Sequence, residues 1–252
     1  MKFDIKDFDK QIEAFTTRID TIYGVTFITL APEHPYVEYI TSKENKNHVK
    51  DYILQSSKKT ERDRITDVKS ISGVFTGGYA IHPLNNKKLP IWISDYVLAG
   101  YGTGAVMAVP CGDQRDYNFA KFFKLPIINI FKDIDISKEA FQSKENFTLI
   151  NSDFLNDLDF KKGFSKAIKE LEKVKKGKHK VNYKLRDAVF SRQRYWGEPF
   201  PVYYKGGLPV MIEEKFLPII LPAVDKYLPT EDGKPPLGNS ECWAWDIKSN
   251  SI

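Results

Sequence analysis

The chain has 252 residues, of which 42% are hydrophobic and 13% aromatic, and its formal net charge is +5. This composition is typical of a globular protein and excludes a long disordered chain. Its apolar runs are all shorter than the roughly 18 residues that a membrane-spanning helix requires, so we expect no contact with a membrane.

Cysteine and histidine usage gives no sign of a metal site. Only Cys111 and Cys242 are present, with no CxxC motif and no paired Cys/His spacing, which indicates a reducing, cytoplasmic location. Residues 1–4 also lack the apolar stretch of a secretory signal. We interpret four histidines without a nucleophile partner as surface or turn residues: His34, His48, His82 and His179.

The first predicted elements lie in residues 12–56. The apolar pattern of residues 12–30 predicts a strand, a polar turn and a second strand, which Pro32 and Pro35 end. Residues 41–44 read Thr-Ser-Lys-Glu, the pattern of a capping box. The pattern predicts a helix after it, with Val49, Tyr52 and Ile53 on one side.

Strands and two helices are predicted downstream. Runs typical of strands occupy residues 79–81, 89–93 and 105–109, with turns at Gly77-Gly78, Asn85-Asn86 and residues 100–104. A short helix is predicted to begin at Asp113, with Tyr117, Ala120 and Phe123 on one side. An amphipathic helix that ends at Gly177 is predicted from Phe160, Phe164, Ile168, Leu171 and Val174. We therefore expect one compact α/β (α+β) domain over residues 10–185.

The remaining residues, 186–252, change in character. Prolines are dense, and Gly206-Gly207 and Gly233 add further breaks, which predicts an irregular Pro-rich appendage. The prolines concerned are Pro199, Pro201, Pro209, Pro218, Pro222, Pro229, Pro235 and Pro236.

Positive charge gathers between Lys169 and Arg194, where eleven basic or potentially basic residues stand against three acidic ones. Such a stretch can follow the phosphate backbone of a nucleic acid. A solvated helix face followed by a basic loop explains the pattern nearly as well, so both interpretations stay open.

The first candidate site is a block of polar residues. Thr16, Thr17 and Thr21 fall within six residues, with Arg18 and Asp20 between them. Their hydroxyls and backbone N–H groups can line an oxyanion or orient a water molecule. Threonine in a strand is also an ordinary choice for β-structure, which is the alternative explanation.

The second candidate site follows the glycine-rich turn of residues 100–104. The apolar run 105–109 brings Asp113 and Asp116 to a helix start, where carboxylates stabilise the exposed N–H groups and the helix dipole. A carboxylate there can instead bind an α-ammonium group through a charge-assisted hydrogen bond. Because no serine elbow or Cys/His pair accompanies these residues, we expect chemistry by a positioned water rather than a covalent intermediate.

The two blocks, with residues 31–35, 73–77 and 90–98 between them in family order, resemble the editing domain of leucyl-tRNA synthetases, the insertion that hydrolyses mischarged tRNA. The resemblance implies a compact, mixed β-barrel-like domain with surrounding helices. Residues 180–187 and 191–197 resemble the linker by which the family's chain returns to the synthetase core. Residues 186–252 are therefore implied to be this return linker and a truncated flank of the core.

Site roles follow from the resemblance residue by residue. Thr21 matches the threonine that blocks the γ-branched chain of leucine, and Asp116 matches the aspartate that holds the substrate's α-ammonium group. Catalytic positions near the scissile ester and the terminal adenosine are implied for Thr16, Thr17 and Arg18, together with Asp116. Substrate-binding positions that line or brace the pocket are implied for Tyr101, Met107, Val109, Asp113 and Arg115, with Thr21.

The implied activity is post-transfer editing, the hydrolysis of the aminoacyl ester of tRNA(Leu) carrying norvaline, isoleucine or methionine, while leucine is spared. Such a second sieve is needed because one methylene is worth only about 1–3 kcal/mol in a hydrophobic pocket. The ATP-site signatures His-Ile-Gly-His and Lys-Met-Ser-Lys-Ser are absent, so we expect no cofactor here, with ATP and Mg²⁺ used only by the full-length synthetase. The implied partners are the 3′-terminal adenosine of aminoacylated tRNA(Leu) and the rest of a monomeric synthetase chain.

Two positions depart from the family pattern. Ile19 stands where the family usually has proline, and Cys111-Gly112 stands where it usually has Gly-His or Ala-His, so we assign no catalytic histidine. The lost histidine leaves open an alternative, a noncatalytic tRNA-binding module with a degenerate pocket. The presence of Thr21 and Asp116 favours the hydrolase, and a general esterase lacks a nucleophile.

Overall fold

The computed structural model describes residues 1–59, 63–64, 70–100, 102–181, 200–221, 246 and 248–249. The chain divides into two units, Met1–Lys180 and Val181–Ile252. The first unit begins before residue 10, because residues 2–5 form a strand of its sheet. Among the described residues, no helix is both long enough and apolar enough to cross a membrane.

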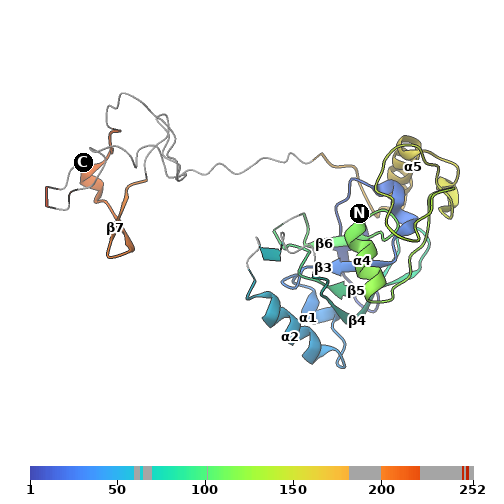
Figure 1. Cartoon of the computed structure of the whole chain (residues 1–252), viewed down its shortest axis with the longest axis horizontal. Helices are drawn as coiled ribbons and strands as arrows, with labels where there is room; N and C mark the ends of the chain where they lie inside the picture. Colours follow the sequence, from blue (N-terminus) through green and yellow to red (C-terminus); the bar gives the residue numbers. More distant parts are fainter. Residues whose placement is uncertain are drawn as a thin grey trace. The chain divides into compact units, whose positions relative to one another are not determined.

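A six-stranded mixed sheet organises the first unit (Figure 1). Its order is β2–β1–β4–β5–β3–β6, in which β3 and β5 are parallel and the other neighbours antiparallel. The strands are β1 (Lys2–Ile5), β2 (Gln11–Glu13), β3 (Phe27–Leu30), β4 (Val74–Ile81), β5 (Lys88–Ile93) and β6 (Ala105–Ala108). This mixed, barrel-like sheet with helices around it confirms the predicted fold class and the predicted strands at residues 79–81, 89–93 and 105–109.

Strand β3 is buried along its whole length because it lies between β5 and β6 with side chains covered on both faces. Successive residues of a strand point to opposite faces. Ile28 accordingly belongs to the main core with Ile91 and Met107, whereas Phe27 belongs to a smaller cluster with Phe119. The sheet therefore carries two separate hydrophobic layers.

Helices pack around this sheet (Figure 1). They are α1 (Val37–Ile40), α2 (Lys46–Ser56), α4 (Gln114–Phe122) and α5 (Phe160–Lys173), with the 3-10 helices η1 (Ile19–Gly24) and η2 (Asp153–Leu155). Helix α4 covers the smaller layer, where the rings of Phe119 and Phe27 stack at 5.2 Å. The predicted helix start at Asp113 is confirmed, and α5 begins within the predicted amphipathic segment but ends at Lys173, before Gly177.

The prediction for residues 12–30 is wrong in its middle, because η1 occupies Ile19–Gly24 between β2 and β3. The backbone N–H and the hydroxyl of Thr21 both donate to the Arg18 carbonyl, at 3.1 and 2.8 Å, which closes a tight helical turn. Every residue of η1 is buried. Since a short buried helix and a buried strand give similar apolar runs, periodicity does not separate them here.

The capping box predicted at residues 41–44 is also wrong. Thr41 ends α1, with its hydroxyl donating to the Val37 carbonyl, and α2 begins only at Lys46 after Asn45. The Ser42 hydroxyl instead accepts a hydrogen bond from the Asn45 side-chain amide at 2.8 Å. The helix itself is confirmed, and Val49 and Tyr52 are buried.

Gly77-Gly78 forms a bulge inside β4 rather than the predicted turn. The register between β4 and β5 shifts between Phe75 and Tyr79, and Gly77 has a φ of +84°. The segment after α1 packs against this bulge, where the Ser42 N–H donates to the Thr76 carbonyl at 2.8 Å. A bulge with a left-handed glycine gives the chain this close approach. The predicted turn at Asn85-Asn86 is confirmed, with Asn86 N–H donating to the His82 carbonyl.

The described part of the second unit contains a hairpin of β7 (Val202–Lys205) and β8 (Leu208–Met211), followed by η4 (Glu214–Phe216). Gly206 and Gly207 have φ values of +58° and +81°, which is the backbone that a tight two-residue hairpin turn needs. The prediction of irregular structure is therefore wrong for this segment. The prolines at 199, 222, 229, 235 and 236 lie outside the described residues.

A substitution at Gly73 tests how tightly α4 packs on the sheet. A Cβ atom at this position would lie 2.7 Å from Phe119 Cε2 and 2.9 Å from the Ile93 carbonyl oxygen. Overpacking of this kind costs about 1–3 kcal/mol, so we expect Gly73→Ala to lower the free energy of unfolding by that amount in urea denaturation.

The matched control is Gly112→Ala, where the new Cβ meets its nearest neighbour, Val109 Cγ1, at an ordinary 3.5 Å. This control should leave the free energy of unfolding unchanged or raise it by up to about 1 kcal/mol. Equal effects of the two substitutions would contradict the tight packing of Phe119 against Gly73.

Candidate functional site

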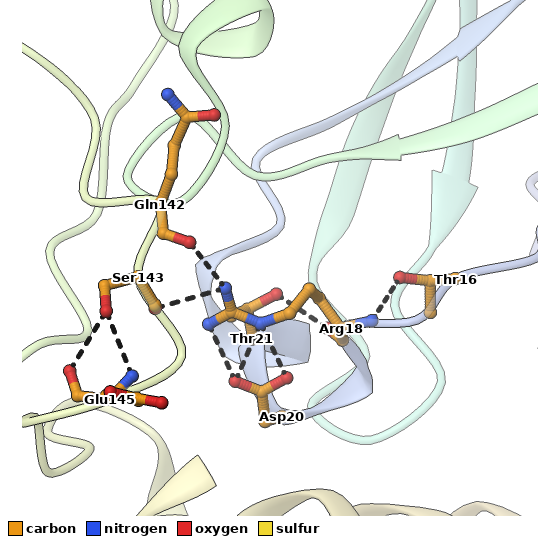
Figure 2. Close-up of polar contacts among 7 residues, drawn as sticks. All are labelled: Thr16, Arg18, Asp20, Thr21, Gln142, Ser143 and Glu145. Carbon is orange, nitrogen blue, oxygen red and sulfur yellow. Dashed lines mark hydrogen bonds and ion pairs between the residues drawn. The ribbon is translucent and has the colours of Figure 1, made fainter.

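A buried ion pair lies at the centre of the threonine block (Figure 2). The Arg18 Nε atom lies 3.1 and 3.2 Å from the two carboxylate oxygens of Asp20, and its Nη2 lies 3.0 Å from Oδ2. Asp20 is fully buried, and the Arg18 side chain is 16% exposed. Burial raises the pKa of Asp20, and the paired guanidinium only partly opposes this shift. A carboxylate buried this deeply requires such a partner.

Arg18 also joins the threonine block to residues distant in sequence. Its Nη1 lies 3.5 and 3.4 Å from the carbonyl oxygens of Gln142 and Ser143 (Figure 2). The guanidinium carbon lies 5.8 Å from the ring centroid of Phe147 and 5.5 Å from that of Phe160. Carbonyls, rings and carboxylate together hold the guanidinium in one orientation, which is the geometry in which arginine binds most specifically.

The three threonines have different surroundings. The Thr21 hydroxyl donates to the Arg18 carbonyl at 2.8 Å, and Thr21 is only 2% exposed. The Thr16 hydroxyl accepts the Arg18 backbone N–H at 2.9 Å. Thr17 is exposed and makes no hydrogen bond to another described residue. The hydroxyl proton of Thr21 is therefore already used within the protein, whereas that of Thr17 is available to a ligand.

His82 supports η1 from the β4–β5 turn. Its Nε2 lies 3.0 Å from the Ile22 carbonyl oxygen, and its Nδ1 accepts the N–H groups of Leu84 and Asn85. Because Nδ1 accepts two N–H groups, the ring proton lies on Nε2, which donates to the Ile22 carbonyl. Burial lowers the pKa of His82. Of the two expected settings, surface or turn, His82 has the second: it opens the Asn85-Asn86 turn, with its side chain buried. Local sequence patterns do not predict this contact, because Ile22 lies 60 positions away along the chain.

Asp116 is buried between the end of β6 and the first turn of α4. Its Oδ2 accepts the Val109 N–H at 2.8 Å, and its Oδ1 lies 3.1 Å from the Tyr96 hydroxyl. Burial, with a smaller contribution from the charge of Asp113, raises the pKa of Asp116 to about 8. Tyr96 was not among the predicted site residues, although it lies inside the 90–98 segment. The Tyr96 hydroxyl also lies 3.2 Å from Thr29 Oγ1.

Asp113 and Arg115 are exposed on the first turn of α4. Asp113 Oδ1 accepts the N–H groups of Arg115 and Asp116, at 2.9 and 3.1 Å, which makes Asp113 the N-cap of the helix. This is the structural role that carboxylates at helix starts usually have. In this structure Asp113 therefore orients the turn that carries Asp116.

The structure brings the two predicted blocks together. The Thr26 N–H that follows η1 donates to the Ala108 carbonyl at 3.2 Å, next to the pairing of β3 with β6. Residues 140–143 connect the other sides of the blocks. Phe141 N–H donates to the Cys111 carbonyl, and the next carbonyl, that of Gln142, faces Arg18.

The predicted apolar residues Met107 and Val109 are 6% and 5% exposed and belong to the main core. Tyr101 lies outside the described residues. Cys111 is fully buried, and burial raises the pKa of its thiol to about 12, so it is not a nucleophile at neutral pH. Among the described residues, no three His, Cys, Asp or Glu side chains are grouped so as to hold a metal ion.

Comparison with known proteins identifies the family. The family model of the leucyl-tRNA synthetase editing domain matches residues 1–172. The leucine–tRNA ligase of Flavobacterium johnsoniae is 62% identical over 99% of this chain and 27% of its own length. That of Flavobacterium psychrophilum is 63% identical over 96% of this chain and 26% of its own length.

A solved structure agrees with these relatives. The agnB2 LeuRS of Agrobacterium radiobacter K84, crystallised in a ternary complex with tRNA and LeuAMS, matches with a TM-score of 0.56 and 31% identity. The match covers 99% of this chain and 28% of that chain. The chain thus spans about a quarter of the length of the relatives that it matches. The family model, which covers more than half of the chain, shows that the chain belongs to the leucyl-tRNA synthetase editing domain family, and the relatives agree.

Proposed function

We propose that this domain hydrolyses the ester bond of tRNA(Leu) mischarged with norvaline, isoleucine or methionine and spares leucyl-tRNA. The observation that carries the proposal is the fixed position of Thr21. Its hydroxyl is bound to the Arg18 carbonyl, inside a turn that the buried Arg18–Asp20 pair holds in place. A rigid side chain of this kind can exclude a substrate by its volume, which is what a second sieve requires.

The ester would lie beside the threonine wall. Thr17 is exposed and offers its hydroxyl, while Thr16 and Arg18 shape the backbone next to it through the Thr16 Oγ1 contact. A hydroxyl and backbone N–H groups held in this way can orient a water molecule and stabilise the oxyanion that forms when the water attacks. Met107 and Val109, with Tyr101, would contribute apolar contacts to the aminoacyl group.

Asp116 would bind the α-ammonium group. At neutral pH the free domain holds this carboxyl mostly protonated, because burial raises its pKa to about 8. An approaching ammonium group favours the ionised form, so Asp116 would release its proton to solvent as substrate binds. The Val109 N–H and the Tyr96 hydroxyl already point at the two oxygens and would stabilise the carboxylate formed. Asp113 and Arg115 would brace this turn.

The rest of the synthetase would supply what this chain lacks. In the parent protein, a monomeric cytoplasmic synthetase in our proposal, ATP and Mg²⁺ would serve leucine activation outside these residues. The 3′-terminal adenosine of the charged tRNA would enter the site described above. A noncatalytic binding module is the alternative, and the Cys111-Gly112 departure is its only support.

The Asp116 role predicts a specific pH dependence. Since binding releases a proton, kcat/KM for deacylation should rise between pH 6 and 8 in the unmodified protein, after subtraction of spontaneous hydrolysis. Asp116→Asn should lose this rise and should lower kcat/KM at pH 7.5 by about 30- to 1000-fold, equivalent to about 2–4 kcal/mol for a charged hydrogen bond.

A stability measurement provides the control for Asp116→Asn. Because the folded pKa of Asp116 lies above its unfolded value, the native state binds the extra proton and its stability falls as pH rises from about 4 to 8. Asparagine can still accept the Val109 N–H and should remove this trend without unfolding the domain. A folded Asn variant that deacylates like the unmodified protein would take Asp116 out of the site.

Four substitutions at Thr21 distinguish an effect of its side-chain volume from an effect of its hydroxyl group. If Thr21 excludes leucine by its size, Thr21→Ala and Thr21→Ser should begin to hydrolyse leucyl-tRNA. Thr21→Val keeps the branched shape and should still spare it, although it loses the bond to the Arg18 carbonyl. Thr21→Tyr should fill the pocket and stop hydrolysis of every substrate. The measurement is the ester half-life of leucyl- and isoleucyl-tRNA with each variant.

A different pattern of ester half-lives would contradict the proposal that Thr21 excludes leucine by its size. If the Thr21 hydroxyl positions the attacking water, Thr21→Ser should behave like the unmodified protein, and Thr21→Val and Thr21→Ala should both be slow on isoleucyl-tRNA while leaving leucyl-tRNA intact. If the unmodified protein does not hydrolyse isoleucyl-tRNA, the hydrolase proposal is rejected and the binding module is favoured.

A further inference from the structure

Helix α5, which packs against η1, carries a strongly basic surface on its exposed side. Its buried positions are Gly163, Ala167 and Leu171, and its exposed face carries lysines at four-, three- and four-residue spacing. These lysines are Lys162, Lys166, Lys169 and Lys173, with Lys161 beside them. At 1.5 Å per residue, the row is about 16 Å long. We call these five residues the α5 lysine row.

The charge is concentrated in this segment. Residues 160–180 hold nine lysines and two glutamates, an excess larger than the net charge of +5 of the whole chain. Glu170 lies 3.5 Å from Lys173, and Asp159 lies 3.8 Å from Lys162. No carboxylate among the described residues forms an ion pair with Lys161 or Lys169. An open depression lined by Lys161, Lys162, Ser165, Lys166 and Lys169 marks the centre of the surface.

The α5 lysine row adjoins the candidate site. Helix α5 packs against η1, and a Cβ atom on Gly163 would lie 3.7 Å from the Cβ of Asp20. At the start of the helix, two cations contact the Phe160 ring: Arg18 Cζ and Lys144 Nζ each lie 5.5 Å from its centroid. Positive charge therefore continues from the lysines through Lys144 to the guanidinium that holds the Thr21 turn.

We propose that the α5 lysine row binds the phosphate backbone of the tRNA acceptor end whose 3′ terminus enters the editing site. The inference rests on the proposed function for its choice of partner. Lysines bind phosphate as point charges and release condensed counterions, which suits a surface that must hold RNA without reading its sequence. A helix is about 10 Å across, so a strand with its end in the site would cross α5 within a few nucleotides.

Charge reversal tests this surface in the 252-residue chain. In the triple variant Lys161→Glu, Lys162→Glu, Lys169→Glu, all three side chains are exposed, and glutamate in the first helical turn complements the helix dipole, so folding should persist. The control reverses three exposed lysines in and before α2: Lys43→Glu, Lys46→Glu and Lys50→Glu. The probes are a tRNA(Leu) transcript for binding and isoleucyl-tRNA for hydrolysis.

The α5 variant should bind the transcript about 10- to 100-fold more weakly at low salt, and the slope of log K against log salt should fall by about 2–3. In hydrolysis it should raise KM by a similar factor and leave kcat within about twofold. A Lys→Gln triple at the same positions should give an intermediate loss. The α2 variant should match the unmodified protein.

Three results would overturn the inference: unchanged binding by the α5 variant, equal losses in both triple variants, or displacement of the tRNA by polyglutamate of equal charge as readily as by RNA. Each of these is read from binding and does not depend on hydrolysis. A domain that binds through the α5 lysine row but hydrolyses no ester would reject the proposed function and leave the RNA surface standing.

Discussion

The Arg18–Asp20 ion pair is the interaction on which the candidate site depends. Asp20 is fully buried, and the Arg18 guanidinium is held by this carboxylate, two carbonyls and the rings of Phe147 and Phe160. The Arg18 carbonyl in turn holds both the N–H and the hydroxyl of Thr21. One buried pair therefore fixes the backbone that carries the proposed sieve. Buried pairs seldom add much stability over an apolar pair, so positioning is the better explanation for keeping one here.

The second half of the site, around Asp116, also depends on a buried carboxyl group, but this group has a different charge state. Asp116 contacts no cationic side chain among the described residues. Burial raises its pKa to about 8, so it is mostly protonated at neutral pH, with its oxygens facing the Val109 N–H and the Tyr96 hydroxyl. A buried acid that is ready to ionise can respond to an incoming ammonium group, whereas a permanently paired carboxylate such as Asp20 cannot. The two aspartates thus have separate tasks, one in fixing the backbone and one in the proposed recognition of the substrate.

Much of the fold could be predicted from the sequence because local rules determine it. Residues 89–93 form a short apolar run with β-branched and aromatic side chains, and Asp113 is a typical N-cap, so the sequence predicts both β5 and the start of α4. Periodicity does not predict the 3-10 helix η1, because a short buried helix and a buried strand give similar apolar runs. The Gly77 bulge is not predicted because it packs against a chain segment 35 positions upstream, at Ser42. In the site, the resemblance supplied Arg18, Thr21 and Asp116. The contacts of His82, Tyr96 and Phe147 come from the tertiary structure alone.

In the proposed mechanism, the Arg18–Asp20 pair would set substrate discrimination through the backbone of Thr21, without touching the amino acid. The most direct measurement is the ratio of leucyl- to isoleucyl-tRNA half-lives for Asp20→Asn, with Arg18→Lys as a second variant that keeps the charge but loses the planar, multidentate contact. Both folded variants should lose discrimination although Thr21 is intact. A folded variant of either kind that keeps the ratio of the unmodified protein would contradict it.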